Sequence, residues 1–222
     1  MPDETHSTTS PARSKVRPWQ ISTASALVLV LAVAGLWQWK PWQSVDLPAS
    51  SCWGLLTRDQ VRPLVGDDGK GTEWSTGGDL SARTPDVTCA IAWQPKGGVA
   101  AVEVKVRQEN ESSHRSVVEE LTRKSTSGEA KPLRFGDGTE AWLRLGFFPT
   151  VLIRCDSHHQ AQPDAVYRRI EVSGDLTLSD LSDQKRAQAF VDLAHRTAKE
   201  IVRQEGCTDV HLADQAPTVP GP

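Results

Sequence analysis

The sequence lacks the short motifs that identify most enzymes and metalloproteins. It contains no Gly-x-Ser-x-Gly motif and no ordered set of serine, histidine and acid that would indicate a hydrolase. No two of its four cysteines are close enough to form a Cys-x-x-Cys metal or redox motif. The glycine pairs Gly77-Gly78 and Gly97-Gly98 lack the strand, turn and helix context of a phosphate-binding loop. The sequence therefore predicts no catalytic, cofactor-binding or metal-binding residue.

An excess of either charge is also absent. The chain has 25 lysines and arginines against 28 aspartates and glutamates, and the segment beyond residue 40 is mildly acidic. A protein that binds nucleic acid carries a basic patch or stripe, and adhesion to an anionic lipid surface also needs clustered basic residues. Neither nucleic acid nor an anionic lipid surface is therefore predicted as a partner.

One long uncharged apolar run is present, from Ile21 to Trp39. As a helix, these residues would reach about 28 Å, close to the roughly 30 Å hydrocarbon thickness of a bilayer. Three basic residues precede the run, whereas only Lys40 follows it closely. Because basic flanks stay in the cytoplasm, we expect residues 21–39 to form a transmembrane helix with a cytoplasmic N-terminus. The preceding basic residues are Arg13, Lys15 and Arg17, and tryptophans at both borders are typical of an aromatic belt.

A cleavable secretory signal is the alternative interpretation of this run. A basic segment precedes a short apolar region, and Ala32-Val33-Ala34 has the small-x-small form of a cleavage site. The apolar character continues to Trp39, which favours a retained anchor over cleavage near Ala34. Retention gives a single-pass membrane protein and cleavage gives a secreted one. Both interpretations place the bulk of the chain outside the cytoplasm.

The four cysteines all lie beyond the apolar run, in the part of the chain that we expect outside. An even number of cysteines in an oxidising compartment predicts two disulfides, and three pairings are possible. We favour the pairing of neighbours in sequence, because each bridge then ties a terminal segment to a strand in the same half of the chain. Four reduced, buried cysteines would instead require a cytoplasmic domain. The favoured bridges are Cys52 with Cys89 and Cys155 with Cys207.

The chain divides into five predicted segments. Residues 1–20 are rich in proline, serine and threonine and are expected to be a disordered cytoplasmic tail. Residues 21–39 are the transmembrane helix, and residues 40–51 are a stalk. Residues 52–208 are long enough for one domain with a hydrophobic core. Residues 209–222 are proline-rich and are expected to be a flexible tail.

The domain is predicted to be of the α+β class, with an antiparallel sheet, helices packed on one face and a long C-terminal helix. Alternating valines indicate a hairpin of two strands, 87–93 and 99–107. Apolar residues at helical spacing indicate helices over 113–124 and 182–204. Residues 67–86 are glycine-rich and predict a long exposed loop that contains Trp74. Further elements are a short helix from Thr57 and strands over 133–135, 141–145, 150–155 and 166–172.

Three histidines are the remaining candidates for chemistry. His158 and His159 stand beside Asp156, which makes this the densest cluster of metal-ligand residue types. Adjacent side chains on an extended segment point to opposite sides, so this pair is interpreted as a solvated turn rather than a metal site. His195 lies at the edge of the apolar stripe of the last helix, and we expect a boundary residue there rather than a catalytic base.

The pattern Cys52-Trp53-Gly54-Leu55-Leu56-Thr57, followed by Gly66, by Cys89 with Trp93 on a strand and by a last helix that ends at Cys207, resembles a known group of domains. These are the small disulfide-bonded extracytoplasmic domains of unknown function in actinobacterial envelope proteins and lipoproteins. The resemblance implies a binding or accessory module without a catalytic residue. This chain differs from many of them because no cysteine ends its apolar run, so lipidation is not expected.

The sequence thus favours a single-pass membrane protein whose disulfide-stapled domain binds a ligand or a cell-envelope partner. The alternative is a secreted or membrane-anchored extracytoplasmic hydrolase whose catalytic residues are scattered in the sequence. The two hypotheses predict different sites. A deep pocket that gathers His158 or His159 with distant acidic residues would favour the enzyme, and a shallow apolar groove near Trp74 would favour binding.

Overall fold

The computed structural model of the chain describes residues 45–80, 85–94, 99–145, 147–155, 166–175 and 177–220. The predicted transmembrane helix at 21–39 and the alternative cleavage site near Ala34 lie outside the described residues, and so do Asp156, His158 and His159. None of the helices in the described ranges combines the length and apolar character needed to cross a membrane. The described residues belong to the compact unit Ser44–Pro222.

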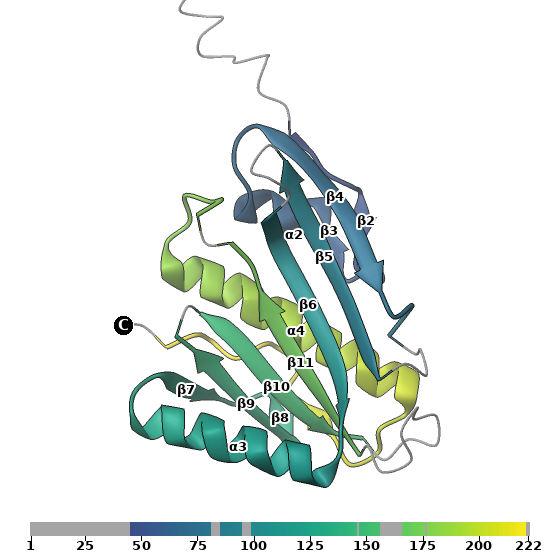
Figure 1. Ribbon diagram of the computed structural model, residues 1–222, viewed down its shortest axis with the longest axis vertical. Helices are drawn as coiled ribbons and strands as arrows, with labels where there is room; N and C mark the ends of the chain where they lie inside the picture. Colours follow the sequence, from purple (N-terminus) through teal and green to yellow (C-terminus); the bar gives the residue numbers. More distant parts are fainter. Residues whose placement is uncertain are drawn as a thin grey trace, which may run out of the picture. The chain divides into compact units, whose positions relative to one another are not determined.

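The predicted α+β class with a large antiparallel sheet is confirmed (Figure 1). The main sheet has eight strands in the order β1-β4-β5-β6-β11-β10-β9-β7. Its neighbouring strands are antiparallel, except for the short parallel pair of β1 and β4. The strands are β1 (Val45–Asp46), β4 (Gly69–Thr76), β5 (Asp86–Gln94), β6 (Val99–Glu109), β7 (Ala130–Leu133), β9 (Thr139–Arg144), β10 (Phe148–Arg154) and β11 (Tyr167–Ser173).

Smaller elements complete the fold. Two short two-stranded ladders pair β2 with β3 and β8 with β12. The helices begin and end at the residues that cap them: Asn110 accepts a hydrogen bond from the Ser113 amide at the start of α3, and Gly206 ends α4 with a φ of +66°. These elements are β2 (Ser50–Ser51), β3 (Leu56–Thr57), β8 (Gly136–Asp137), β12 (His211–Leu212), α2 (Arg58–Val61), η1 (Arg62–Leu64), α3 (Glu111–Thr126) and α4 (Asp183–Glu205).

The β5–β6 hairpin, the long C-terminal helix and the short helix after Thr57 are all confirmed. Val102, Val104 and Val106 are at most 4% exposed and lie on the face of β6 that meets the main core. At the short helix, the Thr57 amide donates to Gln60 Oε1 at 2.9 Å, as the capping-box pattern predicts.

The two long helices lie on opposite faces of the sheet, so the prediction of helices on one face is wrong. Val151 and Ile153 of β10 belong to the main core, which also contains the apolar stripe of α4. Leu152, between them, belongs to a second core with Leu121 of α3. Successive residues of a strand point to opposite faces, so the continuous apolar run of β10 is buried on both sides. Figure 1 shows α3 in front of the sheet and α4 behind it.

The predicted exposed loop at 67–86 is also wrong, because residues 69–76 form strand β4. The glycines in this segment serve packing rather than turns alone. A Cβ atom on Gly69 would lie 2.6 Å from the Trp93 ring, and one on Gly71 would lie 2.6 Å from Leu47 Cδ2. Both glycines therefore let β4 approach neighbouring side chains closely, which is a known role of glycine in strands.

The domain extends further at both ends than expected. Residues 45–51, part of the predicted stalk, carry β1 and β2, and Leu47 is only 1% exposed. Beyond residue 209, in the predicted flexible tail, β12 pairs with β8, and Val210 and Val219 are 5% and 3% exposed. The described part of this segment packs on the domain because its valines add to the main core.

Both disulfides have the favoured pairing. Cys52 and Cys89 have Cα atoms 5.4 Å apart, and Cys155 and Cys207 have Cα atoms 4.8 Å apart. The first bridge ties the segment before α2 to β5, and the second ties the end of α4 to the end of β10. In the chain-entropy model each bridge stabilises the fold by about 4 kcal/mol.

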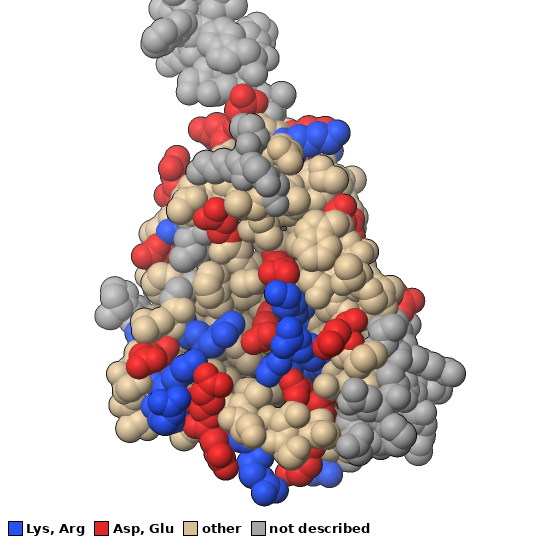
Figure 2. All heavy atoms as spheres, in the orientation of Figure 1, with Lys and Arg blue, Asp and Glu red and all other residues tan. Residues whose placement is uncertain are grey.

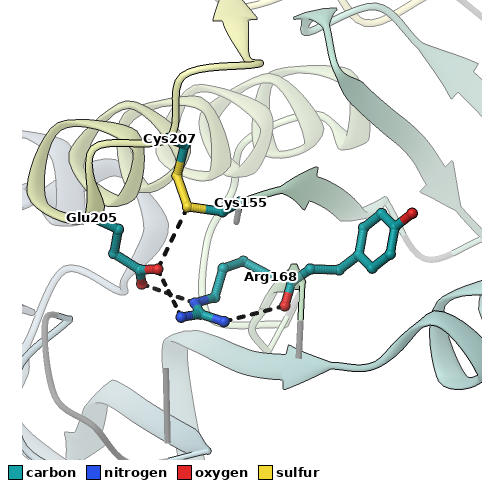
Figure 3. Close-up of a disulfide and its surroundings, with 5 residues drawn as sticks. Cys155, Arg168, Glu205 and Cys207 are labelled. Carbon is teal, nitrogen blue, oxygen red and sulfur yellow. Dashed lines mark hydrogen bonds and ion pairs between the residues drawn. A yellow bond between two sulfur atoms is a disulfide. The ribbon is translucent and has the colours of Figure 1, made fainter. Parts of the chain in front are cut away.

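A buried ion pair lies beside the second disulfide (Figure 3). Arg168 of β11 donates from Nε to Glu205 Oε1 at 2.8 Å and from Nη2 to Glu205 Oε2 at 2.7 Å. Its Nη1 donates to the backbone oxygen of Tyr167 at 3.3 Å. The side chains of Arg168 and Glu205 are only 4% and 8% exposed, so water does not replace a lost partner.

We expect each single substitution of this pair to be more harmful than removal of the whole pair. Arg168→Met or Glu205→Leu leaves one buried charge and should lower the free energy of unfolding by about 3–5 kcal/mol. The double variant should lie within about 1 kcal/mol of wild type, because no buried charge remains. Urea unfolding with the disulfides intact measures all three. A double variant that loses as much stability as the worse single variant would contradict this expectation.

Candidate functional site

Trp74, the residue singled out in the predicted loop, lies on β4 and is 42% exposed. It is paired with Ala90 of β5, on the sheet face opposite α4. Figure 2 shows this face, where acidic and basic side chains are mixed. The charges are paired along the strands, as in Glu103 with Lys105 at 3.0 Å and Glu109 with Arg169 at 3.1 Å. The described residues on this face therefore form no patch of a single sign.

The described residues line a largely apolar pocket of about 380 Å³. It lies where the turn between β9 and β10 meets β7, the start of α4 and the end of the C-terminal segment. Leu145 at this turn is 70% exposed, which is high for a large apolar side chain. The apolar residues around the pocket are Ala130, Leu143, Leu145, Phe147, Val219 and Pro220.

An unusual backbone conformation shapes the wall of this apolar pocket. Phe147 has a φ of +68°, in the left-handed region that bulky residues rarely occupy, at a cost of about 1–2 kcal/mol. Its amide donates to the Arg144 oxygen at 2.9 Å, and the Leu145 amide donates to the Glu129 oxygen at 2.8 Å. The Phe147 ring packs against the main core, which offsets this cost. The turn thus holds Leu145 at the surface beside the pocket.

Six of the thirteen residues around the apolar pocket are polar or charged, but most of the surface that opens into it is apolar. Ser182 caps α4, and Asp183 and Gln184 are its first two residues. The Arg144 guanidinium lies 3.8 Å from Glu171, and its Nε is buried without a hydrogen-bond partner among the described residues. Such a setting, a mostly apolar wall with a few polar atoms, is typical of small-molecule sites.

A second hollow runs beside α4 and is called the α4 groove here. It consists of two adjoining spaces of about 590 Å³ and 410 Å³, which share Gln60 and Arg196. The larger space is lined by α2, η1, the middle of α4 and the C-terminal residues Gln215 and Ala216. The smaller space is lined mainly by polar residues, including Lys199, Glu200 and Arg203.

His195 lines the larger space of the α4 groove, but its ring is only 4% exposed. The expected boundary position is wrong, because the C-terminal segment covers it. His195 Nε2 is 2.8 Å from the Ala213 oxygen, and its ring centroid is 5.8 Å from that of Phe135. Burial lowers the pKa of His195, which favours the neutral ring. The residue therefore anchors the C-terminal segment on α4.

A second histidine cluster joins α3 to the sheet. His114 Nε2 is 2.8 Å from Glu140 Oε2, and the His114 ring stacks on Tyr167 with centroids 3.7 Å apart. The Tyr167 hydroxyl donates to Glu111 at 3.0 Å, and burial and this carboxylate raise the pKa of Tyr167. A phenol that stays protonated and engaged is not a nucleophile, so the cluster acts as a clamp between the layers.

The sequence did not indicate either hollow. Leu145, Phe147 and Arg196 carry no motif, and they come together through the packing of distant segments. The two histidines proposed for a pocket, His158 and His159, lie outside the described residues.

Comparison of the chain with family models, curated proteins and solved structures found no match. The resemblance to actinobacterial envelope domains therefore stays a prediction, and the fold and the two hollows are the basis for function.

His195 should make stability depend on pH. Its folded-state pKa lies below the ordinary value of 6.5, so the unfolded chain binds more protons below pH 6.5. The free energy of unfolding should therefore decrease from about pH 6.5 downward, by at most about 1.4 kcal/mol per pH unit, and level off below the folded-state pKa. His195→Gln keeps an amide donor for the Ala213 oxygen but cannot take up a proton. The variant should therefore lack this decrease in the free energy of unfolding. Urea unfolding of both proteins between pH 8 and pH 5, at about unit steps, checks it, and parallel profiles would refute it.

Proposed function

We propose that the chain is a single-pass membrane protein whose disulfide-stapled domain lies outside the cytoplasm and binds an apolar ligand in the apolar pocket. The location is supported by the apolar run at 21–39, by its basic N-terminal flank and by the two disulfides, which persist in oxidising compartments. A secreted form, cleaved near Ala34, remains the alternative to the anchored one.

The observation that carries the binding function is the apolar pocket itself. Its volume of about 380 Å³ falls within the roughly 300–1,000 Å³ typical of ligand sites. Leu145 is 70% exposed next to it, and exposing this side chain to water has a cost that a bound apolar ligand would remove. The unfavourable φ of Phe147 is a further sign, since such strain clusters at functional sites.

The charges around the apolar pocket favour an uncharged ligand. Lys131 and Arg144 are balanced by Glu129 and Asp183, so the wall has no net charge. The apolar part of a small molecule, or a single aliphatic or aromatic group of an envelope partner, matches this chemistry. The hydrolase alternative gains no support from His114 and His195, because the Nε2 atoms of both rings are engaged by other groups.

We expect Leu145→Asp to weaken binding of a neutral apolar dye such as Nile red about tenfold. Contact with a leucine side chain contributes about 1.5 kcal/mol or more, and 1.4 kcal/mol corresponds to a factor of ten in affinity. Val99→Asp is the matched control, because Val99 is another exposed apolar residue, 37% exposed, that does not line the pocket. Fluorescence titration compares the three proteins. Equal affinities would exclude the apolar pocket as the binding site.

Topology can be tested with a reporter. Alkaline phosphatase fused after residue 43 should be active, because the enzyme needs an oxidising compartment to form its disulfides. Deletion of residues 21–39 should abolish the activity, and replacement of Arg13, Lys15 and Arg17 by glutamate should reduce it. Activity that persists after the deletion would contradict the proposed location. Mass spectrometry of the mature protein then separates an intact anchor from cleavage after Ala34.

A further inference from the structure

We infer that the α4 groove is a second binding site, in which Arg196 binds a carboxylate or phosphate group whose apolar tail lies against Pro63 and Ala216. This inference goes beyond the proposed function, because the α4 groove and the apolar pocket share no lining residue. The ligand class is an anionic amphiphile, whereas the apolar pocket suits an uncharged group.

Arg196 is the central residue because it is half-buried and no described carboxylate lies within ion-pair distance of it. Its Nε donates to the Asp192 backbone oxygen at 3.3 Å, and within the described residues it forms no ion pair. Loss of hydration lowers the pKa of Arg196, and the nearby Asp192 opposes this shift only as a secondary cause. A desolvated guanidinium is costly, and an anionic ligand would supply the missing partner.

The neighbouring charges leave the α4 groove attractive to an anion. Lys199 is three residues further along α4, on the same side as Arg196. Its Nζ donates to the backbone oxygen of Asp214 at 2.9 Å, which carries no charge. Glu200 is held by Arg203 and Gln204, which keep its pKa at about 2, so Glu200 and Arg203 cancel each other. Asp192 is the one opposing charge, and its carboxylate accepts from the Gln188 amide at 2.8 Å.

A neutral donor lines the α4 groove together with Arg196. Gln60 of α2 lines both spaces of this groove together with Arg196. Its Oε1 accepts the Thr57 amide at 2.9 Å, which fixes the orientation of the side-chain amide. The Nε2 group of Gln60 is then left as a donor. A guanidinium and an amide that line the same groove can bind one carboxylate or phosphate.

The larger space of the α4 groove offers the apolar half of the site. Its volume is about 590 Å³, and Pro63, Ala189 and Ala216 give it apolar surface that is open to a ligand. The leucines beneath this surface, Leu56, Leu64 and Leu193, are at most 4% exposed and belong to the core. Apolar side chains beside a charged end define an amphiphile as the ligand. A short alkyl chain that carries a terminal anion fits this arrangement of walls and donors.

Isothermal titration calorimetry of the full chain in nanodiscs, with hexanoate, hexyl phosphate and hexanol as probes, tests the inference. At least one of the two anions should bind, and hexanol should bind at least tenfold more weakly, because it cannot pair with Arg196. The better anion identifies the headgroup chemistry. Empty nanodiscs provide the correction for partition into lipid. Binding of neither anion, or equal binding of hexanol, would overturn the inference.

Variants make the test specific. Arg196→Gln should weaken binding of the anion tenfold or more, whereas Arg115→Gln, on exposed α3, should leave it unchanged. Lys199→Gln should weaken it less, and this second variant keeps the test decisive if Arg196→Gln fails to fold. Leu145→Asp should have no effect on anion binding, which separates this site from the apolar pocket. Wild-type affinity in both Arg196→Gln and Lys199→Gln would show that the α4 groove is not an anion site.

Discussion

The position of α4 on the sheet is the constraint on which both hollows depend. Its apolar stripe packs against β10 and β11 and includes Phe190, Val191, Ala194 and Ile201, each at most 1% exposed. Burial of such side chains stabilises the contact by about 1.5–3 kcal/mol for each large one. The first turn of α4 then lines the apolar pocket, and its middle lines the α4 groove. A shift of this helix would alter both sites together.

The C-terminal end of α4 is fixed in three ways within a few residues. Gly206 ends the helix in a left-handed conformation, Cys207 bridges to Cys155, and Glu205 pairs with Arg168. The ion pair alone contributes little net stability, since the cost of removing two charges from water offsets their attraction. Its geometry is nevertheless specific, because two parallel hydrogen bonds define the orientation of both side chains. The disulfide stabilises this end of the helix by restricting the unfolded chain, and the ion pair orients Glu205 of α4 toward Arg168 of β11.

The elements that the sequence predicted are those with strong local signals. The alternating valines of β6, the capped α3 and the stripe of α4 each bury one face, so periodicity alone reveals them. Strand β4 was missed because Gly69 and Gly71 were interpreted as turn residues. In the fold, the missing side chains of these glycines leave room for Trp93 and Leu47. The second face of β10 was missed because a short apolar run does not show which layers cover it.

The candidate sites were not predictable for a related reason. Each combines residues from segments that are distant in sequence, such as Gln60 with Arg196 and Leu145 with Val219. Local patterns report which side chains are buried, but not which segments meet. The disulfide pairing was an exception, because it followed from the order of strands and termini within each half of the chain.

The C-terminal segment completes both hollows and is itself held by α4. Gln188 donates to the Pro217 oxygen at 3.1 Å and accepts from the Val219 amide at 2.8 Å, and His195 binds the Ala213 oxygen. These side chains replace the backbone partners that an irregular segment lacks, which allows it to pack on the domain despite its prolines. This segment contributes Ala216 to the α4 groove and Val219 to the apolar pocket, so the same stretch of chain borders both hollows. Its conformation follows from its contacts with Gln188 and His195 of α4 rather than from its own composition.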